Sequence, residues 1–235
     1  MKQFIYFLRQ IKYNRSKGAR WSDLRYFFRY RKYTREGTNS IKEELPWLSF
    51  RAVDFLLTEI PADATVFEWG GGGSTTFFNG KVKTLVTVEH NEQWFNWLKE
   101  HLSTRLKMEW NPFFIAAGNG NLMADPDPSE PGHYASGDDN SIGFNFKEYV
   151  TAIDQFPDQQ FDLILVDGRA RTSCIHHAVS KLKTGGLLVV DNAEREYYTE
   201  KNPELRSRFE VCVHGMGPVL YSRDFSETRI YRKLK

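Results

Sequence analysis

The chain has 235 residues, of which 40% are hydrophobic and 15% aromatic, so it can bury the core of one large domain or of a domain with an appendage. Its two cysteines lack CxxC spacing, which argues against a zinc site and a disulfide framework and favours a reducing compartment, the cytoplasm. No apolar run approaches the length of a membrane span.

The net charge of +2 is distributed unevenly. Residues 1–36 hold 11 basic residues against two acidic ones, hence +9, and the rest of the chain therefore carries −7. Apolar residues recur at helical spacing from Phe4 to Ile11 and from Trp21 to Phe28, which predicts a helical extension over residues 1–42. Three interpretations stay open: packing on the body or on a second subunit of a homo-oligomer, peripheral contact of residues 1–36 with an anionic membrane, and nucleic-acid binding. The last is disfavoured because no recognition motif is present.

Residues 43–235 are predicted to form one α/β domain. Its first half consists of a mostly buried helix, a strand leading into four glycines and a short helix, a second strand and its helix, and a third strand. These elements are expected at Trp47 to Ile60, Thr65 to Glu68 with Gly70 to Gly73 and Ser74 to Phe78, Leu85 to Glu89 with Asn91 to His101, and within residues 106–116.

Residues 117–145 are loop-like, and so long a loop predicts a lid or a substrate-contacting segment. Helices are then expected at 146–156 and 173–182, and strands at 161–166, 187–191, 210–213 and 228–232. Strands that alternate with helices and end in a pair of strands predict a Rossmann-like, doubly wound, mostly parallel seven-stranded sheet with a C-terminal antiparallel hairpin.

Four predicted strands end in an acid: Glu68, Glu89, Asp167 and Asp191. Ligands of open α/β sheets bind at the carboxyl ends of the strands, so these carboxylates are expected on one rim. The glycines beside Glu68 suit a backbone with positive φ or one that lies against a nucleotide-like ligand. Glu89 follows Gly70 by 19 positions, a spacing at which a carboxylate can accept hydrogen bonds from ribose hydroxyls.

The glycine pattern discriminates between nucleotide sites. A dinucleotide fingerprint that starts at Gly70 needs glycine where Thr75 stands, and no Gly-Lys-Ser/Thr follows the loop. The order is instead Glu68-x-Gly70-x-Gly72-x-Ser74, and together with the later strands it resembles the class I S-adenosylmethionine-dependent methyltransferases over residues 45–233. The resemblance implies S-adenosylmethionine as cofactor and a binding set of Glu68, Gly70, Gly72, Ser74, Glu89 and His90.

In that set, the resemblance places the methionine part of the cofactor against Gly70 and Gly72, with Glu68 orienting the loop or the amino group. It places the ribose on Glu89 and the adenine beside His90. An acid of the long loop, Asp138 or Asp139, would also face the adenine.

A narrower resemblance concerns Asp167, Asp191 and Asn192, which look like the ligands of Mg²⁺ in the catechol and caffeoyl-coenzyme A O-methyltransferases. The metal would lower the pKa of a substrate hydroxyl. Ala170 stands where those families carry a lysine, flanked by Arg169 and Arg171. In the alternative interpretation, Asp167 touches cofactor or substrate, and Asp191 and Asn192 bind substrate or cap the loop.

Arg169 and Arg171 either form a fork for an anionic substrate or pair with the acids of the same rim. Candidate bases are one of His176 and His177, and the isolated His133 and His214, although a surface or core role is expected for the pair.

We predict a methyltransferase that acts on a hydroxyl of a small molecule or saccharide, with Asp167, Arg169 and Arg171 as catalytic residues. Two alternatives remain: an aminopropyl transferase on the same fold, and a non-catalytic membrane-surface module that retains the cofactor fold.

Overall fold

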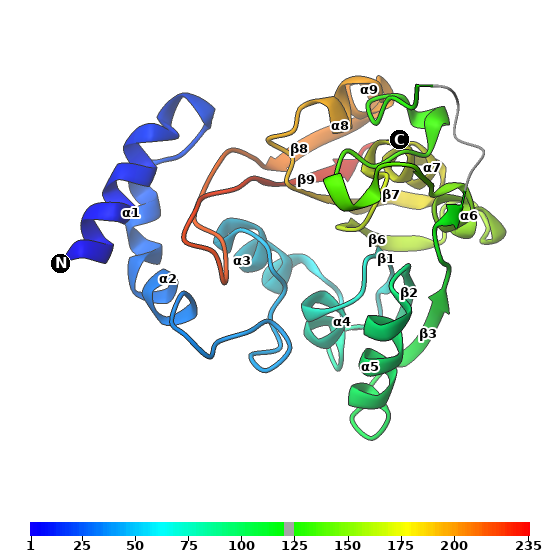
Figure 1. Ribbon diagram of the computed structural model, residues 1–235, viewed down its shortest axis with the longest axis horizontal. Helices are drawn as coiled ribbons and strands as arrows, with labels where there is room; N and C mark the ends of the chain where they lie inside the picture. The colour runs from blue at the N-terminus through cyan, green and yellow to red at the C-terminus, as the bar shows by residue number, and fades with distance from the viewer. Residues whose placement is uncertain (120–124) are drawn as a thin grey trace.

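The computed structural model describes residues 1–119 and 125–235 and contains a seven-stranded sheet with helices on both faces (Figure 1). The strand order is β3-β2-β1-β6-β7-β9-β8. Neighbours from β3 to β7 pair in parallel, whereas β9 runs antiparallel to both β7 and β8. The predicted doubly wound sheet with a C-terminal antiparallel hairpin is confirmed. Its strands are β1 (Thr65–Trp69), β2 (Thr84–Glu89), β3 (Glu109–Phe114), β6 (Phe161–Val166), β7 (Leu182–Asp191), β8 (Phe209–Val213) and β9 (Thr228–Lys233).

Alternate residues of the central strands point to opposite faces, and each face has its own helical layer. Val66 and Leu163 belong to the cluster that includes α3 and α4, whereas Phe67 and Ile164 belong to the cluster that includes α6 and α7. This two-sided burial explains why the strands read as near-continuous apolar runs. The helices of the domain are α3 (Phe50–Glu59), α4 (Gly73–Phe78), α5 (Glu92–Leu102), α6 (Lys147–Thr151), α7 (Arg171–Lys181), α8 (Tyr197–Glu200) and α9 (Glu204–Arg208).

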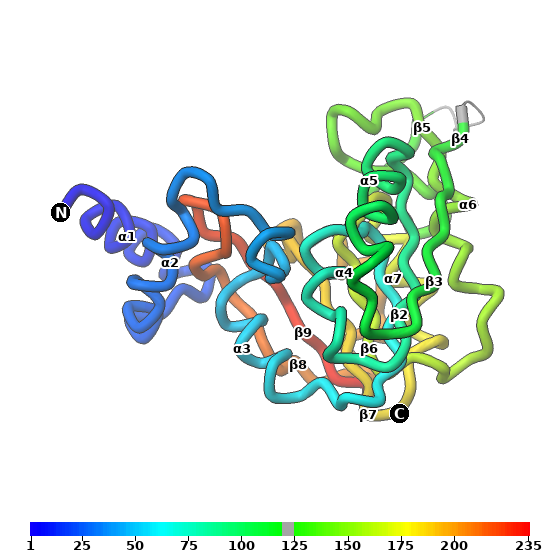
Figure 2. The backbone as a smooth tube through the Cα atoms, turned by 90° about the horizontal axis from the view of Figure 1, so that it is seen from below, coloured from blue at the N-terminus to red at the C-terminus, as the bar shows by residue number. Residues whose placement is uncertain are grey.

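The N-terminal helices α1 (Lys2–Tyr13) and α2 (Phe27–Tyr33) lie beside the loop that joins β8 to β9 (Figures 1 and 2). Phe7 is fully buried, with its ring centroid 4.8 Å from that of Tyr30 and 5.3 Å from that of Phe225 in the loop. The hydroxyl of Tyr30 donates to the carbonyl oxygen of Arg223 at 2.9 Å. The basic extension therefore packs on the body of its own chain, through its apolar residues.

The largest differences from the predicted boundaries concern β7 and α6. The strand β7 begins five residues early, at Leu182, because Gly185 adopts a φ of 82° and an irregularity in the pairing with β6 absorbs the extra residues. The predicted helix over 146–156 is α-helical only to Thr151 and continues as a 3₁₀ turn to Gln155.

The long segment 117–145 contains more structure than the expected loop. Its short strands β4 (Gly118–Asn119) and β5 (Phe144–Asn145) pair in antiparallel, and 3₁₀ turns cover Pro131–His133 and Asp139–Ser141. Residues 120–124 of this predicted lid lie outside the described residues.

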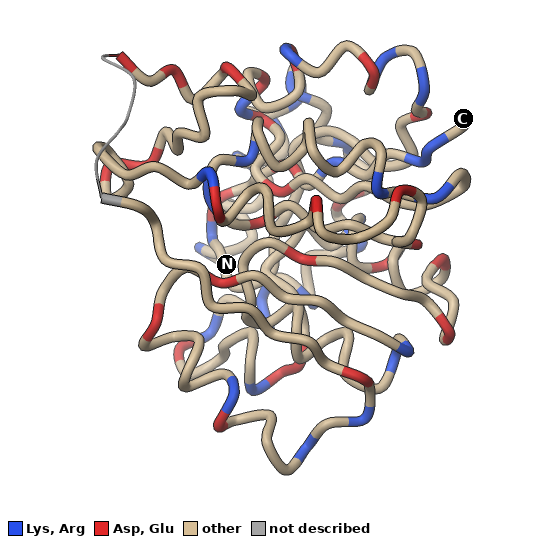
Figure 3. Tube along the Cα trace, turned by 90° about the vertical axis from the view of Figure 1, so that its right-hand side faces the viewer, with Lys and Arg blue, Asp and Glu red and all other residues tan. Residues whose placement is uncertain are grey.

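Basic and acidic residues are interspersed on the side of the molecule remote from the N-terminal helices (Figure 3). None of the helices within residues 1–119 and 125–235 combines the length and the apolar character that a membrane crossing requires.

Candidate functional site

The candidate site lies where the strand order reverses, between β1 and β6. The glycine loop after β1 meets the tip of β6 here, because Gly70 has a φ of 91° and approaches the backbone of Asp167. A Cβ on Gly70 would lie 3.0 Å from the backbone carbonyl oxygen of Asp167, so only glycine allows this approach. The two tips therefore open into one crevice, as the sequence predicts.

A cavity of about 390 Å³ follows the glycine loop, and we call it the glycine-loop cavity. It brings together nearly all of the predicted cofactor-binding and catalytic residues with three side chains that were not predicted. The predicted ones are Gly70, Gly72, Ser74, Glu89, His90, Asp167, Arg169 and Arg171. The additional ones are Ser40, Trp47 and Trp94.

Glu68 lies beneath the glycine loop, not in the cavity. Its carboxylate is fully buried and accepts hydrogen bonds from the hydroxyls of Ser74 and Thr75, both at 2.5 Å, and of Thr87 at 2.8 Å. Burial raises the pKa of Glu68 to about 7, although these hydrogen bonds oppose the shift. Glu68 therefore fixes the loop, which is the first of the two roles that the resemblance implies.

Glu89 faces the cavity from the tip of β2. One carboxylate oxygen accepts from the backbone N–H of Gly71 at 3.1 Å, and the other accepts from the N–H groups of His90 and Asn91 at 2.7 and 2.8 Å. Burial opposes ionisation, but the hydrogen bonds from His90 and Asn91 outweigh it and lower the pKa of Glu89. A fixed anion therefore stands at the position that the sequence assigns to a ribose-binding acid.

Two contacts involve other side chains that line the cavity. The indole N–H of Trp94 donates to the carbonyl oxygen of Gly71 at 2.7 Å. Arg169 forms an ion pair with Asp138 of the long segment, and its Nε lies 3.3 Å from Nε2 of His90. The long segment thus reaches the site through Asp138, one of the two acids expected there.

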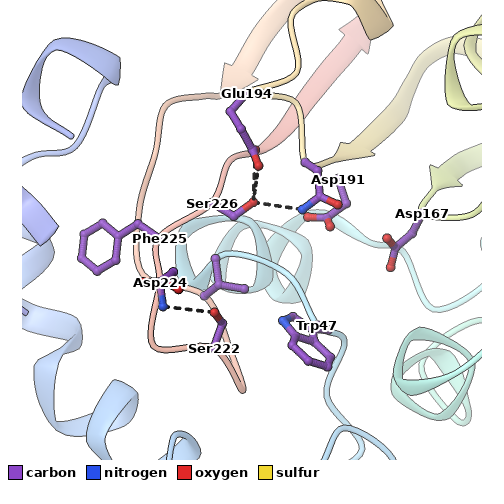
Figure 4. Close-up of a pocket in the computed structure, with 10 residues that line it drawn as sticks. Trp47, Asp167, Asp191, Glu194, Ser222, Asp224, Phe225 and Ser226 are labelled. Atoms are coloured by element: carbon purple, nitrogen blue, oxygen red, sulfur yellow. Dashed lines mark hydrogen bonds between the residues drawn. The ribbon is translucent and has the colours of Figure 1, made fainter. Parts of the chain in front are cut away.

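A second cavity of about 430 Å³ adjoins the first, and we call it the acidic cavity (Figure 4). Trp47 and Asp167 line both cavities. Its remaining lining comes from the tip of β7 and from the loop between β8 and β9: Asp191, Asn192, Glu194, Val219, Ser222, Asp224, Phe225 and Ser226.

Arg171 occupies the position where the narrower resemblance implies a metal ion. Its guanidinium is 3.1 Å from a carboxylate oxygen of Asp167, 3.1 Å from the amide oxygen of Asn192 and 3.8 Å from a carboxylate oxygen of Asp191. It also donates to the backbone carbonyl oxygens of Asp191, at 2.5 Å, and Gly168, at 3.0 Å. The three expected ligands thus already face one cation.

These residues do not fit a divalent metal, because the guanidinium fills the space between their oxygens. Among the described residues, no group of three or more His, Cys, Asp and Glu is arranged to hold a metal ion. The expected Mg²⁺ site finds no support, and of the two interpretations of Arg171 the structure shows the ion pair with the acids of the rim.

Asp167 and Asp191, the two acids that face Arg171, differ in their pKa values. Burial and the nearby charge of Asp167 raise the pKa of Asp191 to about 8, so this carboxyl is mostly protonated at neutral pH. Burial also raises the pKa of Asp167, to about 6, but its pairing with Arg171 limits the rise. The shorter contact of the Arg171 guanidinium with Asp167, 3.1 Å against 3.8 Å for Asp191, favours the negative charge on Asp167.

None of the candidate histidine bases lines either cavity. His177 lies 2.9 Å from the carboxylate of Asp154, and His133 accepts a hydrogen bond from the backbone of Asp127 at 3.0 Å. His176 and His214 are exposed.

The strand order, the glycine loop at the switch point and the antiparallel last strand define the fold of the class I S-adenosylmethionine-dependent methyltransferases, which confirms the predicted fold family. A scan against models of known protein families finds no match, and neither does a search of curated proteins.

Solved structures share this fold at low identity. A candidate O-methyltransferase of Klebsiella pneumoniae has a TM-score of 0.52 and 14% identity, over 83% of this chain and 88% of that one. A methyltransferase-like protein of Silicibacter pomeroyi has a TM-score of 0.51 and 19% identity, over 82% and 91%. TrmN of Thermus thermophilus, with a TM-score of 0.48 and 12% identity, is matched over 78% of this chain and 48% of its own length, so this chain spans about half of that protein.

Proposed function

We propose that this protein transfers the methyl group of S-adenosylmethionine to a hydroxyl oxygen of a small molecule or saccharide. The observation that carries the proposal is the position of Asp167, which lines both the glycine-loop cavity and the acidic cavity. A methyl group that passes from a donor in the first cavity to an acceptor in the second must cross the boundary that Asp167 and Trp47 form.

The glycine-loop cavity supplies the donor site. The backbone around Gly70 and Gly72 accommodates the methionine part, and the ionised Glu89 accepts hydrogen bonds from the ribose hydroxyls. The rings of Trp94 and His90 border the space left for the adenine. S-adenosylmethionine supplies a methyl group on a positively charged sulfur, which leaves as a neutral thioether.

Asp167 accepts the proton that the acceptor hydroxyl must lose. The hydroxyl oxygen forms the new bond to the methyl carbon, the carbon–sulfur bond breaks with its electron pair retained on sulfur, and the proton moves to the carboxylate. With a pKa of about 6, Asp167 is ionised at neutral pH and remains a usable base. Arg171 holds it in that state and in one orientation. No step requires a metal.

Aminopropyl transfer is the second candidate, because the carboxylates of the acidic cavity also suit an amine acceptor. The products separate the two reactions: methyl transfer releases S-adenosylhomocysteine, whereas aminopropyl transfer from the decarboxylated cofactor releases methylthioadenosine.

Calorimetric titration with S-adenosylhomocysteine tests the donor site. We expect saturable binding to the wild type, unchanged by Mg²⁺ or by a chelator, and a loss of at least about ten-fold in affinity for Glu89→Ala. Asp63→Asn, an exposed carboxylate before the start of β1, is the matched control. Absence of binding to the wild type would refute the proposal, and an unchanged affinity of Glu89→Ala would refute the role of that residue.

A further inference from the structure

The acidic cavity has a lining of one charge sign. Four carboxyl groups border it, those of Asp167, Asp191, Glu194 and Asp224, and no lysine, arginine or histidine is among its lining residues within the described part of the chain (Figure 4). The chain beyond residue 36 carries a net charge of −7, but this general excess of acid does not by itself place four carboxyl groups around one cavity. It requires a ligand or a structural partner as explanation.

A basic side chain neutralises only two of these four carboxyl groups. Asp167 and Asp191 share the guanidinium of Arg171. Glu194 and Asp224 have no basic side chain within 4 Å in residues 1–119 and 125–235. They are also absent from the lining of the glycine-loop cavity, so the sulfonium charge of a bound donor does not explain them either.

Neutral donors hold both carboxylates in place. Glu194 accepts from the backbone N–H of Glu227 at 2.9 Å and from the hydroxyl of Ser226 at 3.1 Å. Asp224 accepts from the hydroxyl of Tyr6 at 2.5 Å and from the amide of Gln10 at 3.2 Å. These contacts orient the oxygens without neutralising them, so the cavity keeps its negative potential.

One exposed aromatic ring borders the same cavity. Trp47, half exposed, lines it together with the carboxylates, whereas the ring of the buried Phe225 turns away from them and packs on Phe7, with 5.3 Å between the ring centroids (Figure 4). Carboxylates near an indole ring are a combination that binds ammonium and guanidinium groups, because ring quadrupoles and negative charges both attract cations. A volume of about 430 Å³ suits a small molecule.

We propose that the acceptor is a cationic small molecule, a hydroxyl compound that carries a protonated amine, and that Glu194 and Asp224 bind its positive charge. This inference rests on the proposed methyl transfer and adds the substrate class. The amine is held by the carboxylates remote from the donor, and because it is protonated it has no lone pair with which to attack. The hydroxyl end faces Asp167, to which it loses its proton as the oxygen gains the methyl group.

Tritiated methyl transfer from S-adenosylmethionine tests the charge of the acceptor. The probe is a polar small-molecule extract of the organism's cells, separated at pH 7 on a cation exchanger into retained and unretained fractions. We expect the wild type to label compounds of the retained fraction. Label only in compounds of the unretained fraction would overturn the cationic acceptor while leaving methyl transfer intact, whereas label in neither fraction would refute the proposed function itself.

Variants then test the two carboxylates. With the retained fraction below saturation, Glu194→Gln and Asp224→Asn should each lower the labelling rate about ten-fold, because each change replaces a charge-assisted contact by a neutral one. Affinity for S-adenosylhomocysteine should stay at the wild-type value, and Asp63→Asn should leave the labelling rate unchanged. A double variant that labels the retained fraction as fast as the wild type would overturn the assignment of the cation site.

Discussion

Replacement of Arg171 by methionine tests how the acidic rim works. Methionine keeps much of the volume of the side chain but removes the charge that faces Asp167 at 3.1 Å and Asp191 at 3.8 Å. If Asp167 is the base, its pKa must rise when this cation is lost, because burial and the charges of Glu68 and Glu89 then raise it without the opposing guanidinium.

The size of the effect follows from the structure. A paired guanidinium lowers the pKa of a carboxyl by about 1–3 units, so the pKa of Asp167, about 6 in the wild type, should rise to about 7–9 in the variant. The ionised fraction at pH 7 then falls from about nine-tenths to between about one-half and one-hundredth. We therefore expect kcat at pH 7 to fall about 2- to 90-fold and to recover as the pH rises towards the new pKa.

The assay is release of S-adenosylhomocysteine with saturating acceptor between pH 5 and pH 10. Arg171→Lys should give an intermediate profile, because it keeps the charge but loses the planar fork. Arg206→Met, which removes an exposed arginine of α9, is the matched control. A variant whose activity stays low at all pH values, although it is folded and binds S-adenosylhomocysteine, would refute the reasoning that Arg171 acts through the ionisation of Asp167.

Three further predictions concern other parts of the molecule. The pKa of Glu68 is about 7 in the folded protein against 4.5 for a free carboxyl, so its contribution to stability is present below pH 4.5 and is lost as the pH rises through 7. In urea unfolding, the free energy of unfolding of Glu68→Gln should therefore rise by about 3 kcal/mol relative to that of the wild type between pH 4.5 and pH 8. A difference between the two proteins that stays constant over this range would contradict the prediction. Gly72→Ala should keep the melting temperature of the wild type, because a Cβ at this position meets only Trp94, at 3.6 Å, but it should weaken binding of S-adenosylhomocysteine in the cavity that both residues line. Gly73→Ala should instead destabilise the fold, because its Cβ would collide with Ser40. Equal melting temperatures for the two glycine variants would show that loop packing does not distinguish them. The full chain should sediment with anionic but not neutral vesicles, because residues 1–36 carry a net charge of +9 and expose Tyr13 and Phe28, whose side chains are 77% and 78% exposed. Equal sedimentation with both kinds of vesicle would argue against an electrostatic membrane contact.

The cofactor half of the site could be predicted from sequence because it depends on local order. A strand, four glycines and a helix determine the topology, and the spacing of 19 positions from Gly70 to Glu89 determines the position of the acid. Parallel strands bring their carboxyl ends to one edge, so the tips of β1, β2, β6 and β7 had to meet there. Trp94 could have been found by the same logic, because it lies in the first turn of the helix that follows Glu89.

The acceptor half could not be predicted, because it depends on contacts between distant segments. Glu194 follows the tip of β7 directly, but Ser222 and Asp224 come from irregular chain without hydrophobic periodicity, and only the antiparallel return of β9 brings them beside it. Spacing also could not reveal that the guanidinium of Arg171 turns inward to the acids while its neighbour Arg169 turns to Asp138.

The N-terminal extension supports one wall of the acidic cavity although none of its described residues lines the cavity, so we expect it to affect binding of the acceptor. Helix α1 supplies the hydroxyl of Tyr6 to Asp224, and Phe7 packs on Phe225 in the same loop. Tyr6→Phe removes a hydrogen bond that orients the carboxylate of Asp224, so KM for the acceptor should rise while the affinity for S-adenosylhomocysteine stays constant. Tyr13→Phe removes an exposed hydroxyl from the end of the same helix and is the matched control. If Tyr6→Phe weakened cofactor and acceptor binding equally, the extension would be a general support of the fold and not a part of the acceptor site.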